Sequence, residues 1–522
     1  MTPATAFNLL DEPWIPVCTT RGDVREVSLA DVLLNAGDYV ALSEPSPPNL
    51  VALHRLLLAI LHRALTTHHG KWTDKDRARW FLDGLPQAPI RAYLEQWRDR
   101  FWLFHPTQPF MQVAALAEAE ETRDKLKAGA QVELGRANGN TPVMFDHSFD
   151  DAPQSVSCAA ACRNILGLLQ FTPGGLVKTV RDSDKAGALA NTAAVVPLGS
   201  NLAESLLLAL HPFDARGDDL PSWERFPPTI TTLLADPTLA SGPNDRYTRL
   251  SRAVLLVSDG DTGQVRRLRF AAGIALNEDP NAPDPMACYR VNREGKPIRV
   301  SFSEGRSIWR DLPSLVPDPS RSKDIPAAVL EWAANLHQAL GRETAPMRIL
   351  TAGLASDQAK LLRWRTESIE LPGVLLVHAD AGDLLRMQVR FAEDMYFALS
   401  RIYGDFIAQT MPDPEHKDTR ARARSIVANG PAAATFFSAA ERALPRLMKQ
   451  IASGDIDAAD RDWKAALQEA AHQSWAAVRR TLGDTPAALR SDALTWPRFR
   501  GLLKSLVQPA VQTVPATQEI SA

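Results

Sequence analysis

The chain has 522 residues, of which 45% are hydrophobic and 23% charged. Its 58 basic and 61 acidic side chains nearly cancel and leave a formal net charge of -3. This length predicts roughly three domains, or two if one is large. The near-neutral charge excludes a protein that binds nucleic acid through its overall positive charge, so any such contact must come from local basic patches.

Cysteine usage and hydropathy indicate a cytoplasmic protein. The four cysteines, none in CxxC spacing, are Cys18, Cys158, Cys162 and Cys288. Such sparse usage is typical of a reducing compartment, and we interpret Cys158 and Cys162 as small buried side chains rather than zinc ligands. The N-terminus lacks a signal-peptide pattern, and no apolar run approaches the roughly twenty residues of a membrane span. We therefore expect no membrane contact, no metal and no cofactor.

The first hundred residues predict a strand followed by two helical regions. Residues 7–17 mix strand-forming residues with two prolines, which indicates a bent edge strand. Residues 50–65 have apolar side chains at helical spacing, with His54 and His62 expected on the flanks of the apolar face. A second helical region is expected over 80–104, with an aromatic stripe that points to core packing.

The next part of the chain predicts a long loop and a helix that ends near two glycines. Residues 141–157 have no hydrophobic period, and loops of that length in compact chains are often functional or disordered. Residues 157–170 predict a helix rich in small residues, followed by Gly174 and Gly175. Paired glycines either cap the helix or let another backbone approach closely, and the spacing alone favours the cap. A further apolar helix is expected over 202–210.

The middle of the chain changes to the two-residue period of strands. Residues 253–258 and 264–270 predict a β-hairpin with an Asp-Gly turn, and residues 289–301 a second one. The second strand of the first hairpin carries Arg266, Arg267 and Arg269. These charges are equally compatible with nucleic-acid contact and with a solvated edge that discourages strand pairing.

Residues 347–365 change from apolar to polar to basic within one short stretch. We expect a buried strand that ends at Ile349 and Leu350, a turn at Gly353, and a small polar tip over 355–358 that includes Ser356, Asp357 and Gln358. The basic flank holds Lys360, Arg363, Trp364 and Arg365. Guanidinium groups beside an indole suit an anionic polymer with stackable bases, whereas the alternative is an ordinary hairpin with a solvated basic flank.

The C-terminal part predicts a helical bundle. Four apolar stripes at helical spacing cover residues 383–406, 431–451, 463–482 and 487–507, with bends expected at Pro445 and Pro497. Between the first two lies a basic patch that contains Arg420, Arg422 and Arg424. The predicted fold is therefore α+β, with a large mixed domain over 1–378, an antiparallel four-helix bundle over 379–507 and a disordered tail over 508–522.

The sequence offers few signs of catalysis. It contains no GxxxxGK[ST] phosphate loop, no HExxH and no GxSxG. Asp146 and Asp150, in the long loop, could in principle hold a divalent cation for phosphodiester hydrolysis. Neighbouring acids in a loop are usually only solvated, so a metal-dependent nuclease is a minor alternative and we expect no enzyme.

Two N-terminal motifs give the chain a family resemblance. The first is Leu9-Leu-Asp-Glu-Pro-Trp-Ile-Pro-Val17, and the second is Phe101-Trp-Leu-Phe-His105 followed by Pro109-Phe-Met-Gln112. With the order of elements behind them, the chain resembles the large subunit of the type I-E CRISPR surveillance complex, Cascade. The resemblance spans nearly the whole chain.

The resemblance implies a sensor without catalytic activity. Large subunits of this family recognise the protospacer-adjacent motif (PAM) through the minor groove of double-stranded DNA, help to open the duplex for R-loop formation and provide the platform for a helicase-nuclease. The implied partners are the other Cascade subunits, the guide CRISPR RNA, the target duplex with its displaced strand, and that helicase-nuclease. A protein-only scaffold subunit is the alternative from another class.

The resemblance also implies roles for individual residues. Gln358, at the hairpin tip beside Ser356 and Asp357, matches the wedge placed under the PAM. The glycine loop that approaches the minor groove matches Thr172–Gly175, although only two glycines are present. The groove-inserting basic residue matches Arg269, or Arg267 if an indel shifts the match, and it is an arginine where the best-known members have lysine.

The remaining roles concern the guide and the DNA backbone. The long loop near the 5′ end of the guide matches roughly 144–157, with Phe145 and Phe149 as competing anchors beside His147. The basic residues expected to hold the DNA backbone are Arg266, Arg267, Lys360, Arg363, Arg365, Arg420, Arg422 and Arg424.

Overall fold

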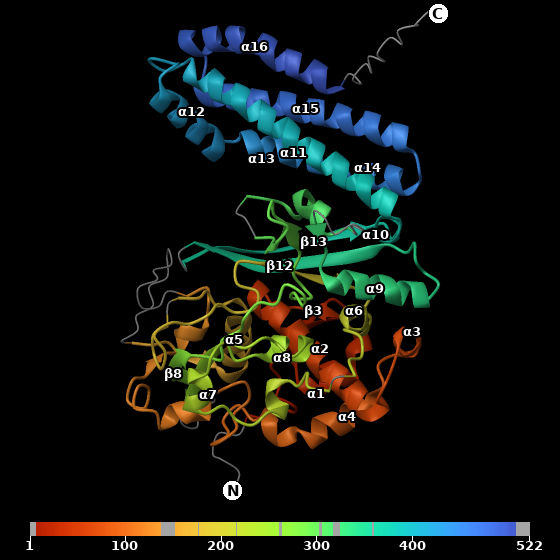
Figure 1. Cartoon of the computed structure of the whole chain (residues 1–522), viewed down its shortest axis with the longest axis vertical. Coiled ribbons are helices and arrows are strands. Elements are labelled where there is room, and N and C mark those ends of the chain that lie inside the picture. Colours follow the sequence, from red (N-terminus) through yellow and green to blue (C-terminus); the bar gives the residue numbers. More distant parts are fainter. Residues whose placement is uncertain are drawn as a thin grey trace, which may run out of the picture. The chain divides into compact units, whose positions relative to one another are not determined.

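Figure 1 shows the computed structural model of the chain, which describes residues 7–136, 152–175, 177–215, 217–259, 264–301, 305–316, 324–357 and 360–507. At 356–357, 360–363 and 506–507 only the backbone is described. The chain is mixed helix and sheet, as predicted, and divides into two compact units, Met1–Ala379 and Asp380–Ala522. The predicted disordered tail, 508–522, lies outside the described residues.

Helix α2 (Pro47–His69) lies in the core of the first unit. It contacts α4 (Gln87–Gln96), α5 (Cys158–Phe171) and α8 (Pro243–Thr248). By length and composition it could cross a membrane, so the prediction that no apolar run approaches that length is wrong, but its apolar window is 83% buried within the protein. Burial on every side is what a core helix requires.

Two histidines of α2 differ from the prediction. His54 and His62 were expected on the flanks, but each is only 3% exposed. His54 Nδ1 lies 2.9 Å from the carbonyl oxygen of Leu50, and the His62 ring stacks on that of His211 with centroids 3.7 Å apart. The partner of His62 comes from a distant segment, which is why helical periodicity alone misplaced it.

The other helices of the first unit surround this core. The predicted helical region over 80–104 consists of α3, α4 and a short 3-10 helix, because Gly84 and Pro86 separate the first two. The bounds of the remaining helices are α1 (Leu29–Leu34), α3 (Asp74–Asp83), α6 (Leu202–Ala209), α7 (Ile230–Leu234), α9 (Ala328–Ala339) and α10 (Val374–Val377).

The N-terminal sheet has the order β2-β1-β3, formed by β1 (Ile15–Thr19), β2 (Val24–Val27) and β3 (Tyr39–Leu42). The prediction of an edge strand over 7–17 is wrong, because β1 pairs on both sides and begins only at Ile15. Pro16 is tolerated in a central strand at this position because the first pairing with β3 begins at Val17.

The two predicted hairpins in the middle of the chain are confirmed. Strand β7 (Arg252–Ser258) pairs antiparallel with β8 (Gln264–Ala272), and β8 also pairs with the short strands β4 (Lys127–Ala128) and β5 (Val156–Ser157). Strand β9 (Tyr289–Val291) pairs with β10 (Pro297–Arg299) and with β11 (Asp324–Ile325).

The third sheet is built on a long hairpin (Figure 1). Strand β12 (Met347–Asp357) pairs with β13 (Lys360–Leu371) and, on its other edge, with β6 (Ala193–Leu198). The prediction of a turn at Gly353 is wrong, because the strand continues through it to Asp357. A Cβ on Gly353 would lie 2.1 Å from the carbonyl oxygen of Thr192. Glycine at this position therefore lets the backbone of β12 pack closely against the residue that precedes β6.

The second unit is helical, and the predicted count of four helices is not confirmed. Its described residues hold α11 (Ala379–Ala408), α12 (Lys417–Asn429), α13 (Ala432–Glu441), α14 (Leu444–Ala452), α15 (Ile456–Leu482) and α16 (Pro486–Val507). The basic patch forms a helix of its own, and the predicted helix over 431–451 is divided before Pro445. Met387, predicted in the apolar stripe of α11, is 55% exposed.

Candidate nucleic-acid interface

The glycine loop after α5 is a place of close backbone approach rather than a simple helix cap. Helix α5 ends at Phe171, and the loop continues beside residues 184–187. Thr172 accepts a hydrogen bond from Gly187 N at 2.8 Å, and Asp184 accepts one from Gly175 N at 3.3 Å. A Cβ on Gly174 would lie 2.8 Å from the backbone nitrogen of Ala186, so no side chain fits there. The prediction that these glycines cap the helix is therefore wrong.

The arginines of strand β8 lie in the same unit as this loop, on the strand whose far end, at Ala272, pairs with Arg252. Arg266 and Arg267 are exposed between the buried residues Val265 and Leu268. Arg266 pairs with Asp259 at 2.8 Å, while Arg269 is half-buried and donates to the carbonyl oxygen of Arg123 at 3.2 Å. Arg267 therefore presents the least engaged guanidinium of the three to solvent, since no described residue hydrogen-bonds to it or pairs with it.

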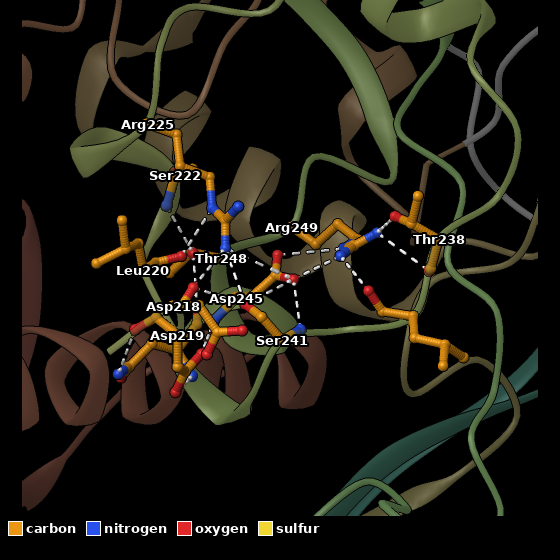
Figure 2. Close-up of polar contacts among 12 residues, drawn as sticks. Asp218, Asp219, Leu220, Ser222, Arg225, Thr238, Ser241, Asp245, Thr248 and Arg249 are labelled. Carbon is orange, nitrogen blue, oxygen red and sulfur yellow. Dashed lines mark hydrogen bonds and ion pairs between the residues drawn. The ribbon is translucent and has the colours of Figure 1, made fainter. Parts of the chain in front are cut away.

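A polar network fixes the chain just before β7 (Figure 2). The Asp245 carboxylate accepts hydrogen bonds from Arg249 Nη2 at 2.5 Å and from Ser241 N at 3.0 Å. Arg225 lies 3.8 Å from the same carboxylate. On the other side Ser251 donates to the carbonyl oxygen of Leu169 at 2.6 Å, so the start of β7 is tied to the end of α5.

The base of the β12–β13 tip packs on a glycine from the segment before the long loop. A Cβ on Gly135 would lie 2.5 Å from the indole of Trp364, which is 38% exposed. In the same segment, a Cβ on Gly129 would lie 3.2 Å from the carbonyl oxygen of Arg266 in β8. Residues 129–135 thus connect the basic strand to the hairpin.

The basic residues predicted to hold the DNA backbone differ in their surroundings. Arg365 pairs with Glu367, donates to the carbonyl oxygen of Arg306 and is 19% exposed, so its guanidinium is already engaged. On α12, in the second unit, Arg420, Arg422 and Arg424 are all exposed. Arg420 pairs with Glu415.

Several predicted residues lie wholly or partly outside the described structure. The wedge residue Gln358 and the long-loop residues Phe145, His147 and Phe149 are not described, and neither are Asp146 and Asp150 of the nuclease alternative. Of Ser356, Asp357, Lys360 and Arg363 only the backbone, in β12 and β13, is described. Among the described residues, no group of three His, Cys, Asp or Glu side chains could hold a metal ion.

Some residues of this region were not predicted from the sequence. The sequence patterns single out neither Gly129 nor Gly135, and they place Arg252 outside the predicted strand 253–258. Their roles depend on Arg266, Trp364 and Pro173, which are distant in sequence, so local patterns carry no signal for them.

Comparisons with known proteins agree with the resemblance. The model of the family "CRISPR-associated protein Cse1" matches residues 8–474. The chain is 35% identical over 513 residues to "CRISPR-associated protein CasA/Cse1" of Thermus thermophilus, covering 96% of this chain and 98% of that protein.

Solved structures share the fold. The structure of Thermus thermophilus CasA (Cse1) has a TM-score of 0.82 at 32% identity, covering 96% of this chain and 100% of that one. At 24% identity, Thermobifida fusca Cse1 has a TM-score of 0.79 and covers 97% and 99%. A chain of a "CRISPR RNA-guided surveillance complex" has a TM-score of 0.72 at 23% identity and covers 96% and 99%. The chain described here therefore belongs to the Cse1 family of CRISPR-associated proteins.

Proposed function

We propose that this protein is the PAM-sensing subunit of a type I-E RNA-guided surveillance complex. It reads the short flank of a target through the minor groove of duplex DNA, while the guide RNA reads the target by base pairing. It then helps to open the duplex and offers the platform for a helicase-nuclease. Its partners in this role are the other subunits, the guide RNA and the target DNA, and it works in the cytoplasm without catalysing a reaction or binding a cofactor.

The single observation that carries the proposal is the connection among three elements of the first unit. Arg252, at the start of β7, donates a hydrogen bond of 2.5 Å to the carbonyl oxygen of Pro173 in the glycine loop. Strand β7 pairs with the basic strand β8 along its length. Gly129 then packs on β8 and Gly135 on Trp364 of the β12–β13 hairpin. The glycine loop, the strand with the exposed arginines and the base of the β12–β13 hairpin are thus connected within one unit.

This arrangement suits the minor groove of a duplex. Two consecutive glycines let backbone groups come near the base edges, and exposed guanidiniums are attracted by the negative potential of the groove. The minor groove presents a degenerate pattern of donors and acceptors, so such a reader should accept several related flanks. A planar amide at the hairpin tip, such as Gln358, could replace part of the pairing and stacking that are lost on opening, which cost a few kcal/mol.

The test compares complexes reconstituted with and without this chain. Guide-matched duplexes that differ only in the three or so bases beside the target are titrated at two salt concentrations. We expect discrimination between flanks only when the chain is present. If flank identity makes no difference to binding or opening, the chain is a scaffold subunit and the sensor proposal is wrong.

The wedge role is tested by Gln358→Ala. We expect the variant to slow duplex opening, followed by 2-aminopurine fluorescence in the target, more than it weakens initial duplex binding. Gln96→Ala, which removes an exposed glutamine from α4, is the matched control and should change neither. Opening at the wild-type rate by the Gln358 variant would rule out this residue as the wedge.

A further inference from the structure

The buried side chain of Arg252 joins the glycine loop to the sheet that carries the basic strand. It is 1% exposed at the first residue of β7, and its guanidinium makes contacts in three directions. Its Nη2 donates to Pro173 O at 2.5 Å, its Nη1 donates to Lys185 O at 2.8 Å, and it forms an ion pair with Asp184, whose side chain is also 1% exposed.

These contacts reach both segments of the loop region. Pro173 belongs to the glycine loop, while Asp184 and Lys185 belong to the segment that runs beside it. The two segments also bond directly to each other, through Gly175 N to Asp184 O and Gly187 N to Thr172 O. The planar guanidinium of Arg252 therefore contacts both the glycine loop and the segment beside it, and it holds the two against the first residue of β7.

Strand β7 connects Arg252 to the arginines of β8 through the hydrogen-bonded pairing of the two strands. Its pairs run from Arg252 opposite Ala272 to Val257 opposite Arg267. A second tie, from Ala272 N to Thr179 O at 3.2 Å, holds the same corner. The buried contacts of Arg252 thus join the loop directly to the sheet that carries the β8 arginines.

We infer that Arg252 is a positioning residue that sets the glycine loop relative to the basic strand β8, so that discrimination between DNA flanks depends on a guanidinium that does not touch DNA. The inference rests on the proposed sensor function and adds to it the residue that aligns the two groove-facing elements. Binding sites held by rigid supporting contacts lose selectivity when those contacts are loosened, even if each binding group is kept.

Arg252→Lys is the most informative variant. Lysine keeps the positive charge and can pair with Asp184, but a single ammonium cannot reproduce the fork that bridges the carbonyl oxygens of Pro173 and Lys185. Burial lowers the pKa of Arg252 to about 10 against the opposing effect of Asp184, so the native group is charged at neutral pH. Asp184→Asn is the second variant, for use if the lysine variant does not fold.

Arg77→Lys provides a matched control for lost stability. Arg77 is also 1% exposed and donates to the backbone, to Leu207 O at 2.8 Å and Trp332 O at 3.2 Å, but it contacts neither the glycine loop nor β8. Gly175→Ala is the positive control, because Gly175 has φ +84° and belongs to the loop itself. All variants are reconstituted into the complete guide-bound complex.

The measurement is the ratio of affinities for a favoured and a disfavoured flank in otherwise identical duplexes. We expect Arg252→Lys and Gly175→Ala to lower this ratio by about tenfold, and Arg77→Lys to leave it unchanged at a similar loss of thermal stability. If Arg252→Lys keeps the wild-type ratio while Gly175→Ala loses it, the positioning role is wrong and the sensor function stands. Equal losses in both lysine variants would also overturn the positioning role, and a wild-type complex without discrimination would overturn both proposals.

Discussion

His62 and His211 form a buried, stacked pair whose protonation is opposed by its surroundings. Burial lowers the pKa of His62 to about 3, with a smaller contribution from Arg63, and burial places the pKa of His211 well below its ordinary value of 6.5. Asp219 lies 3.8 Å from His211, and Asn244 lies 3.0 Å from His62. Both rings are therefore neutral in the folded protein at neutral pH.

This pair predicts a loss of stability in mild acid. Between pH 6.5 and about 3 the unfolded chain binds protons that the folded pair does not, so the free energy of unfolding falls as pH falls, by up to about 1.4 kcal/mol per pH unit for each histidine. His211→Leu should reduce this slope in urea titrations at pH 6.5 and 5.0. An unchanged slope in the variant would contradict the assignment.

The ion pair of Arg55 and Asp284 is also fully buried, with both side chains 0% exposed. Burial raises the pKa of Asp284, but Arg55, Arg246 and Arg299 outweigh that effect and hold it below its ordinary value of 3.8. The pair therefore stabilises the fold above that pH, and this contribution is lost as the pH falls through the lower folded pKa.

Asp284→Asn is expected to lower the free energy of unfolding by about 3 to 5 kcal/mol at pH 7, because it leaves the buried charge of Arg55 without its partner. Asp11→Asn breaks an exposed pair with Arg98, 2.7 Å apart, and should cost less than about 1 kcal/mol. Urea denaturation compares the two variants. Equal small effects would show that the buried pair is energetically unimportant.

At the scale of elements, the contact between Gly135 and Trp364 can be tested by a double-mutant cycle. Gly135→Ala places a methyl group 2.5 Å from the indole and should lower the free energy of unfolding by about 1 to 3 kcal/mol. In the Trp364→Ala background Gly135→Ala should lower the free energy of unfolding much less, because the indole that the methyl group would clash with is absent. Additive effects in urea denaturation would mean that the two residues do not meet.

Elements were predictable where a single local period decides them. The alternation of β7 and β8 and the apolar spacing of α2 and α6 suffice to place them, and the structure confirms all four. Gly353 was misjudged because its constraint is the backbone of Thr192, which belongs to another part of the chain. The central position of β1 likewise depends on β3, and no pattern within β1 reports that pairing.

At the scale of the whole molecule, the net charge of -3 means that the DNA binding proposed above depends on local basic patches. Replacing Arg420, Arg422 and Arg424 of α12 by alanine should weaken DNA binding by the complex. The slope of log K against log salt should fall by up to about two units if Arg422 and Arg424 each meet a phosphate, because Arg420 already pairs with Glu415, and flank preference should be unchanged. An unchanged slope would show that the arginines of α12 do not contact DNA phosphates.

The matched control for this triple variant lies in the same unit. Arg446 and Arg461 are about 70% exposed, at 71% and 70%, and both pair with Asp462. Replacing both by alanine should leave the salt slope nearly unchanged, because these charges already have a carboxylate partner. Filter binding or anisotropy at four salt concentrations separates the two variants.

The candidate site was predictable as a set of segments but not as an arrangement. The basic strand, the glycine loop and the hairpin were all named from local composition and family resemblance. The contacts that join them, through Arg252, Gly129 and Gly135, link residues far apart in the chain. Burial also decides which arginines are available, and Arg365 shows that a basic residue in a promising stretch can already be engaged by its own fold.

The burial of α2 on all sides has a consequence for synthesis of the protein. Its covering helices α5 and α8 end at Phe171 and Thr248, so the ribosome must add most of the first unit before the helix can be enclosed. At about 5 to 20 residues per second, this takes about ten to forty seconds. During that time the nascent chain carries an uncovered apolar segment of membrane-spanning length, which favours aggregation and resembles a membrane-targeting signal until the covering helices are made.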